Sequence, residues 1–252
     1  MTKISDRTLG AIILAAGKGK RMKSKDANKV TLPLADKPLI LHAIHLFENM
    51  DFGAIVVVVG FAKDSVKKVL KDNQIIFAEQ TKRLGTAHAV KSGLASVPSN
   101  ISDVLVIQGD DSHFYKEATI KKLMETHINA DASLTFVTID VENPFGLGRI
   151  VRNDKDDVVA IVEEKDATDG QKKIKEVNPA CYVFKVDFLK KYLPQVQKSP
   201  ITGEYYLTSL ITIAIKYKEP IATLRAGAMP WRGVNTREEL QEAEKLYHDL
   251  NQ

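Results

Sequence analysis

The sequence has very little cysteine: its 252 residues include only Cys181. A single thiol cannot form an intramolecular disulfide, and chains without disulfides are typical of reducing compartments. The first apolar run follows polar residues and is too short for the core of a signal peptide. No apolar run approaches the ~20 residues that a membrane-spanning helix needs. We therefore expect a cytoplasmic protein with no membrane segment.

The sequence also lacks a strong charge imbalance. Its 36 lysines and arginines and 32 aspartates and glutamates leave a formal net charge of +4, spread along the chain. A nucleic-acid-binding domain more often clusters its basic residues among aromatic ones. The chain contains no repeat of 20–50 residues and no low-complexity tract. These absences disfavour nucleic acid as a partner and favour small acidic ligands such as nucleotides.

What the chain does contain is an alternation of apolar runs and helical patterns. Runs rich in Val and Ile predict strands at 12–16, 54–59, 75–78, 104–108, 132–140 and 221–226. Apolar residues at helical spacing predict helices at 38–50, 64–71, 86–97, 118–130, 204–217 and 236–250. This order predicts an α/β fold with a mostly parallel central sheet and helices on both faces. Short strands and turns at 143–184 predict a small mixed-strand lobe that covers the sheet.

A glycine-rich loop, Gly17-Lys-Gly-Lys-Arg21, follows the first predicted strand. Two glycines and three cations can bring backbone N–H groups and positive charge against a polyphosphate. The loop does not match a Walker A motif, which requires Gly-Lys-Ser/Thr. It does not match the dinucleotide fingerprint either, because Met22 occupies the place of the third glycine. The loop is thus either a phosphate cradle or a tight turn with its lysines in solvent.

A carboxylate stands at the end of another predicted strand. Asp110 follows the strand at 104–108, and Gly109 opens close access to the backbone. Ligands of open α/β sheets bind beyond the carboxyl ends of the strands, where a carboxylate can hold Mg²⁺ beside phosphates. Asp110 could instead supply hydrogen bonds to a turn. Asp111 is either a second metal ligand or a solvated turn residue.

Several motifs occur in an order that resembles a known family. They are LAAGKGKRM at 14–22, Lys29-Val30, Gln80 with LGTAH at 84–88, Gly109-Asp110, GLGRI at 146–150, IVEEKDA at 161–167, EVN at 176–178, GEYY at 203–206 and GVN at 233–235. The set resembles the pyrophosphorylase domain of bacterial N-acetylglucosamine-1-phosphate uridylyltransferases, which are nucleoside-diphosphate-sugar pyrophosphorylases. The resemblance implies a single domain over 1–252 with a Rossmann-like nucleotidyltransferase fold and a sugar-binding lobe. It implies the reaction of UTP with N-acetylglucosamine 1-phosphate.

The resemblance also implies a role for each matching residue. The backbone of Leu14, Ala15, Ala16 and Gly17, with Gln80 and Gly85, would bind uracil. Arg21 and Lys29 would be the catalytic cations on the phosphates. Thr86, Gly148, Glu163 and Asn178 would hold the sugar and ribose, and Gln108 and Gly109 would also bind substrate. Asp110 and Asn235 would ligate Mg²⁺, the one expected cofactor. The expected partners are UTP and a sugar 1-phosphate, and the oligomeric state stays open.

The sequence departs from the family's pattern in three ways, one of which is an additional residue between Met22 and Lys29 that leaves the geometry of the loop open. Gln108 replaces a tyrosine that usually precedes Gly-Asp, which leaves the choice of sugar open. Glucose 1-phosphate and dTTP are therefore alternative substrates, and a non-catalytic nucleotide-sugar-binding protein is an alternative function. The chain also contains no hexapeptide repeats of the β-helix acetyltransferase domain of the bifunctional relatives, so acetyl transfer is not expected.

Each of five implied site residues has a second interpretation. Lys29 could belong to a solvated basic loop, Gln80 could face solvent from an edge strand, and Glu163 could lie in a solvated charged run. Asn178 could be a turn former before Pro179. Asn235 could simply precede the helix that Thr236 and Glu239 cap in a capping box. The positions of these side chains in the fold decide between the interpretations.

Overall fold

The computed structural model describes residues 7–22, 26–228, 231 and 233–250. Its strands are β1 (Leu9–Ala15), β2 (Pro33–Leu34), β3 (Lys37–Pro38), β4 (Ala54–Val59), β5 (Ile76–Glu79), β6 (Asp103–Gln108), β7 (Leu134–Asp140), β8 (Gly148–Arg152), β9 (Val158–Val162), β10 (Glu176–Asn178), β11 (Tyr182–Lys185) and β12 (Ile221–Ala228). Its α-helices are α1 (Leu39–Phe47), α2 (Lys63–Val69), α3 (Thr86–Leu94), α4 (Glu117–Asn129), α5 (Asp169–Lys172), α6 (Val186–Tyr192), α7 (Ser209–Lys216) and α8 (Arg237–Leu250). Short 3₁₀ helices are η2 (Lys20–Met22), η3 (Lys29–Thr31), η4 (Ser112–Phe114) and η5 (Leu193–Gln195).

Ten of the described strands form one sheet, in the order β5-β4-β1-β6-β11-β7-β10-β8-β9 with β12 paired to β7. The strands β5, β4, β1 and β6 are parallel to one another, and β12 is parallel to β7. Each of the parallel neighbours is reached through a helix, as crossover connections require. The prediction of an α/β fold with a mostly parallel central sheet is confirmed.

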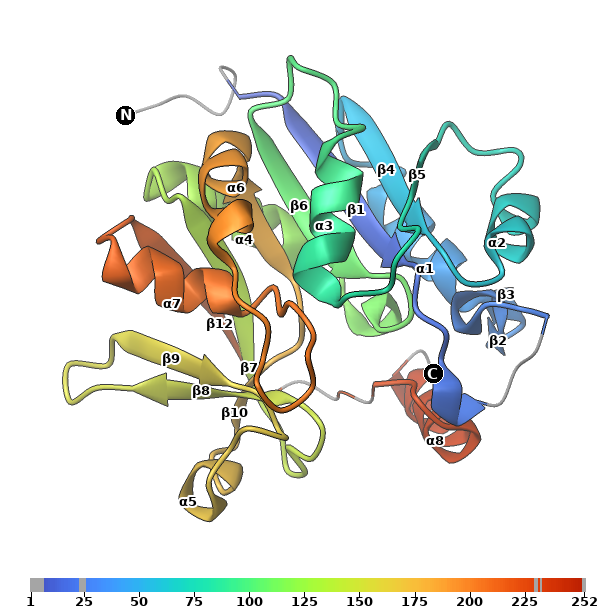
Figure 1. Ribbon diagram of the computed structural model, residues 1–252. Helices are drawn as coiled ribbons and strands as arrows, with labels where there is room; N and C mark the ends of the chain where they lie inside the picture. The colour runs from blue at the N-terminus through green and yellow to red at the C-terminus, as the bar shows by residue number, and fades with distance from the viewer. Residues whose placement is uncertain (1–6, 23–25, 229–230, 232, 251–252) are drawn as a thin grey trace.

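Helices cover both faces of this sheet, as the sequence predicts. In β1, Ile13 belongs to a core that includes apolar residues of α1, α2, α4 and α8, whereas Ile12 belongs to a second core that includes residues of α3, α6 and α7. Figure 1 shows α3 in front of the parallel strands and α1 behind them. Both isoleucines are fully buried, which contributes about 1.5–3 kcal/mol each. A strand buried on both faces reads as a continuous apolar run, and this is how β1 and β4 appear in the sequence.

The lobe at 143–184 does not cover the sheet, so that part of the prediction is wrong. Its strands β8, β9 and β10 continue the sheet at the end opposite β5, as Figure 1 shows. The strand β11 then inserts antiparallel between β6 and β7. This insertion gives the backbone groups of both strands a hydrogen-bonding partner, which a covering lobe would leave unpaired. The lobe is therefore an extension of the same sheet.

The helix predicted for 204–217 begins five residues later than expected, at Ser209. The backbone of Tyr205 donates to Leu84 O (2.8 Å) and accepts from Ala87 N–H (2.9 Å) instead of forming a helical turn. These tertiary bonds connect residues 204–207 to the loop before α3. The other expected elements shift by a few residues at their ends, and α6 was not expected. No helix among the described residues is long and apolar enough to cross a membrane.

Candidate active site

A cavity of about 830 Å³ opens beyond the carboxyl ends of β1 and β6. Every residue that the sequence predicts for the site lines it, except Gly109. The lining comes from the glycine loop, the loop before α3, the extension of the sheet and the segment before α8. Ligand sites of α/β proteins lie at this edge of the sheet. The fold therefore gathers residues from the whole length of the chain at one place.

Gly109 is absent from the described residues that line the cavity. A Cβ there would lie 3.2 Å from Leu14 O and 3.3 Å from Ile13 Cγ2, both on β1. Its N–H donates to Leu14 O over 3.0 Å. Gly109 thus allows β6 to approach β1 closely, and its role in this structure is packing below the cavity.

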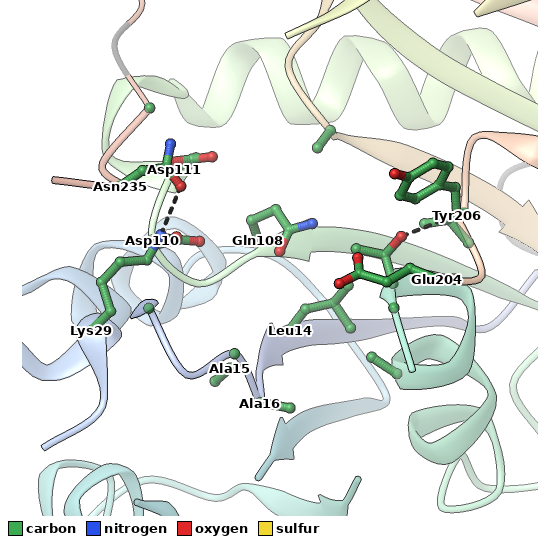
Figure 2. Close-up of a pocket in the computed structure, with 18 of the residues that line it drawn as sticks. Leu14, Ala15, Ala16, Lys29, Gln108, Asp110, Asp111, Glu204, Tyr206 and Asn235 are labelled. Carbon is green, nitrogen blue, oxygen red and sulfur yellow. Dashed lines mark hydrogen bonds and ion pairs between the residues drawn. The ribbon is translucent and has the colours of Figure 1, made fainter. Parts of the chain in front are cut away.

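The charged end of the cavity consists of Lys29, Asp110 and Asn235. The Lys29 ammonium forms an ion pair with the Asp110 carboxylate and lies 3.3 Å from Asn235 Oδ1. Figure 2 shows the three side chains converging at one end of the pocket. Lys29 and Asn235 are 206 positions apart in the sequence, so only the fold brings them together. Oxygens that hold an ammonium ion in this way could also hold a divalent cation.

Lys29 is not part of a solvated loop. Only 12% of its side chain is exposed, and the side chain also donates to Val234 O. Burial alone would lower the pKa of Lys29, but the carboxylates of Asp110 and Asp111 outweigh burial and raise it. The ammonium therefore stays charged inside the cavity.

Asp111, which the sequence leaves open, is not a solvated turn residue. Its Oδ1 accepts from Val234 N–H over 3.1 Å and so ties the segment before α8 to the end of β6. Burial, followed by the neighbouring Asp110 charge, raises the pKa of Asp111 to about 7. No spacing rule reveals this contact, because Val234 is distant in the sequence.

Sequence reasoning missed Asn28, which is 1% exposed. Its Nδ2 donates to Ala15 O (2.9 Å) and Phe61 O (2.8 Å), and its Oδ1 accepts from Val30 N–H (3.1 Å). These bonds fix the glycine loop against the loop after β4 and cap η3, which carries Lys29. Asparagine is a favoured N-cap residue, and that preference was the available signal.

The glycine loop itself remains open to the cavity. Gly17 has no described atom within 4 Å of the place a Cβ would take, so a ligand can approach its backbone. Arg21 is exposed on η2 and lines the cavity. The side chain of Lys20, expected to add charge, lies outside the described residues.

Gln80 is buried rather than placed on a solvated edge, with 4% of its surface exposed. Its Nε2 donates to Gly85 O over 3.1 Å, across the loop that precedes α3. Gly85 has φ = +107°, and a Cβ there would lie 2.5 Å from Tyr205 O. Glycine is therefore required where this loop meets the 204–207 segment. Beside it, Thr86 Oγ1 accepts from Leu207 N–H over 2.9 Å.

Asn178, which also lines the cavity, has an unused donor. Its Oδ1 accepts from Ala180 N–H (2.8 Å) and from the Tyr182 hydroxyl (2.6 Å). Its Nδ2 is buried and has no hydrogen-bond partner among the described residues. Buried polar atoms are rarely left unpaired, so this amide N–H group is available to a ligand. Asn178 forms a turn and also lines the site.

Glu163 supplies an acceptor near Asn178. Its Oε1 accepts from the Thr208 hydroxyl over 2.7 Å, and burial raises the pKa of its carboxyl group. A Cβ on Gly148 would lie 2.9 Å from Ile161 Cγ2, so Gly148 permits close packing of β8 on β9 beneath Glu163. Figure 2 places Gln108 midway between the charged end and the Glu204–Tyr206 wall.

A family model described as nucleotidyl transferase matches residues 10–249. Among curated proteins, the chain is 42% identical to the bifunctional protein GlmU of Caldicellulosiruptor saccharolyticus over 236 residues, which are 93% of this chain and 50% of that protein. It is 39% identical to GlmU of Legionella pneumophila over 243 residues, 95% of this chain and 52% of that protein. The chain thus spans about half the length of the curated relatives it matches.

Solved structures share the fold. A Bacillus anthracis structure assigned as a glucose-1-phosphate thymidylyltransferase aligns with a TM-score of 0.80 at 22% identity, covering 96% of both chains. The inositol-1-phosphate CTP transferase of T. maritima aligns with a TM-score of 0.74 at 18% identity, again over 96% of both. At these identities the likeness supports the architecture alone. The Rossmann-like nucleotidyltransferase fold expected from the motifs is confirmed.

Proposed function

The chain belongs to the nucleotidyl transferase family, and from this premise we propose that it transfers UMP from UTP to N-acetylglucosamine 1-phosphate, releasing pyrophosphate. The family assignment makes the protein a nucleotidyltransferase, and the relatives at about 40% identity suggest the choice of sugar and nucleotide. The observation that carries the proposal is the Lys29 ammonium held between Asp110 and Asn235 at one end of the cavity.

The reaction requires positioning and charge neutralisation rather than a protein nucleophile. An oxygen of the sugar phosphate attacks the α-phosphorus of UTP, the bond from that phosphorus to the β-phosphate oxygen breaks, and pyrophosphate leaves. The attacking oxygen is already ionised, so no strong general base is needed. Lys29 and Arg21 line the cavity and would neutralise the triphosphate, Arg21 with a bidentate guanidinium.

We propose that Mg²⁺ binds at Asp110 and Asn235. Their carboxylate and amide oxygens already hold a cation, the Lys29 ammonium, and hard oxygen donors suit Mg²⁺. The described residues include no cluster of three or more His, Cys, Asp or Glu side chains that could enclose a metal ion. In phosphoryl-transfer sites Mg²⁺ is usually coordinated by one or two protein oxygens, and water and phosphate oxygens provide the remaining ligands. The ion would supply charge stabilisation to the triphosphate and to the leaving pyrophosphate.

Amide and carboxyl side chains away from Lys29 would bind the base and the sugar. Gln80 offers an amide to the uracil, and the open backbone at Gly17 permits close approach of the nucleotide. Asn178 offers an N–H donor and Glu163 an acceptor, which together complement hydroxyl or acetamido groups of a sugar. Both substrates are small soluble anions, and the lone, buried Cys181 fits the proposed cytoplasmic location.

A substrate panel tests this function directly. Pyrophosphate release is measured for UTP, dTTP, CTP, ATP and GTP against N-acetylglucosamine 1-phosphate and glucose 1-phosphate, with and without Mg²⁺. We expect the highest kcat/KM for UTP with N-acetylglucosamine 1-phosphate and Mg²⁺. A higher value for glucose 1-phosphate or dTTP would assign the alternative substrate. Tight UDP-sugar binding without turnover would make the protein a binder and refute the proposal.

A further inference from the structure

His88 is a polar side chain that the proposed reaction does not use. It lies on α3, half-buried, and is absent from the described residues that line the cavity. Its Nδ1 is 3.0 Å from Nε2 of Gln80. The histidine thus lies behind the glutamine, and any effect on a ligand must pass through Gln80.

The contacts of Gln80 determine which way its amide faces. Gly85 O lies 3.1 Å from Nε2, and a carbonyl oxygen can only accept, so the nitrogen must be on this side. The amide nitrogen carries a second hydrogen, which is directed at His88 Nδ1. Both N–H groups of the amide are therefore engaged within the protein. Its Oε1 remains as the acceptor that Gln80 presents to the cavity.

For this arrangement His88 Nδ1 must carry a lone pair and not a proton. Burial lowers the pKa of His88, and the cations of Lys91 and Lys82 lower it further. The neutral ring then holds its proton on Nε2 and accepts at Nδ1. In a protonated ring, the Nδ1–H donor of His88 would face the Nε2–H donor of Gln80, and no hydrogen bond could form.

We propose that His88 is a positioning residue that holds the Gln80 amide with its oxygen toward the cavity, so that the site selects nucleotides whose base carries an imide N–H. Uracil and thymine donate from N3, which matches Oε1. Cytosine has an acceptor at N3, and its approach would leave two acceptors facing each other. Sites built to pair one polar group discriminate strongly against an analogue that lacks it. The inference rests on the proposed function, because it concerns the same nucleotide pocket.

Three substitutions test the role of His88. His88→Phe and the smaller His88→Leu remove the acceptor, whereas His88→Asn places an amide oxygen near the position of Nδ1. The readouts are kcat and KM for UTP and CTP, together with dissociation constants of UDP and CDP measured by calorimetry without turnover. The matched control is His45→Phe, because His45 is an exposed histidine on α1 whose Nδ1 lies 2.7 Å from Glu48 Oε1 and which is absent from the described residues that line the cavity.

The wild-type chain should prefer UTP over CTP by a factor on the order of 10² or more. Loss of the Nδ1 acceptor should reduce this preference roughly 5- to 10-fold, which corresponds to the net free energy of one neutral hydrogen bond. The loss should appear in KM and in the UDP dissociation constant, with kcat for UTP within about twofold. The Asn variant should regain the preference, and the His45 variant should keep it.

Two results would overturn the inference. One is equal affinity of the wild-type chain for UDP and CDP. The other is an Asn variant that loses the preference as fully as the Phe and Leu variants, since that points to packing alone. A preference for UDP that falls in the Phe and Leu variants, without turnover on any sugar phosphate, would refute the proposed function and leave the role of His88 supported. The binding constants separate the two conclusions.

Discussion

The two ends of the cavity are built differently. At the charged end, Lys29, Asp110 and Asn235 contact one another directly, and a full ionic charge lies on two of them. At the neutral end, Gln80 and Asn178 are amides whose orientation is set by hydrogen bonds to neighbouring residues of the protein. Each of these amides keeps one group for the ligand.

This difference implies a division of labour. Charged groups act most strongly where charge develops during the reaction, so the charged end should control kcat. Oriented neutral donors and acceptors contribute modest energy but large selectivity, so the neutral end should control KM and the choice of substrate. Four predictions test the division, in decreasing order of expected effect.

Removal of divalent cations should have the largest effect. Without Mg²⁺, the triphosphate loses the charge stabilisation that Asp110 and Asn235 are proposed to hold in place, and turnover should fall to background. Pyrophosphate release is followed during titration with EDTA and restored with excess Mg²⁺. UDP affinity relative to CDP should remain, because the base-binding groups are uncharged. Full activity in EDTA would contradict the account.

The substitution Asp110→Asn should lower kcat on the order of 10²-fold or more, as loss of a preorganised electrostatic group does. It keeps the shape of the side chain and removes the charge that Lys29 contacts. The matched control is Asp187→Asn, because Asp187 is an exposed aspartate on α6 paired with Lys190. Unchanged turnover in the Asp110 variant would show that Asp110 has no role in the reaction.

Gly85→Ala should destabilise the fold by roughly 1–3 kcal/mol, because a Cβ would clash with Tyr205 and φ is positive. Chemical denaturation measures the change in the free energy of unfolding. Gly203→Ala is the control: its φ is +71°, but no described atom lies within 4 Å of the added Cβ. The difference between the two variants isolates the close contact that shapes the neutral end. Equal destabilisation would show that only the backbone conformation matters.

The smallest effect is expected for Tyr182→Phe. Asn178 Oδ1 would keep the Ala180 N–H but lose the hydroxyl donor, so the amide would be held less firmly. KM for the sugar phosphate should rise about 5-fold, with kcat within twofold. Tyr192→Phe is the control, since its hydroxyl donates to Glu219 away from the cavity. A change in kcat with unchanged KM would contradict the assignment of Tyr182 to the neutral end of the cavity.

The sequence predicted the parts of the fold that depend on local patterns. The apolar run before Gly17, the capping box of Thr236 and Glu239, and the order of strands and helices all follow from neighbouring residues. The capping contacts are present, with Thr236 Oγ1 accepting from Glu239 N–H over 3.1 Å. The motif resemblance led to the residues that line the cavity, apart from Gly109.

What the sequence missed depends on contacts between distant segments. Residues 204–208 look helical, but the backbone hydrogen bonds of Tyr205 go to the loop before α3. The strand β11 returns to the middle of the sheet, which no local pattern indicates. Asn28 and Asp111 form hydrogen bonds that hold loops of the site, and His88 contacts the Gln80 side chain. Such supporting residues become visible only when the fold shows what they hold.

The division of labour is tested most directly by measuring kcat and KM for the sugar phosphate in Asp110→Asn and Tyr182→Phe under one set of conditions with Mg²⁺ and saturating UTP. Asp110→Asn should lower kcat on the order of 10²-fold with little change in KM. Tyr182→Phe should raise KM about 5-fold at nearly constant kcat. If both variants change the same parameter by similar factors, the two ends of the cavity do not have separate roles.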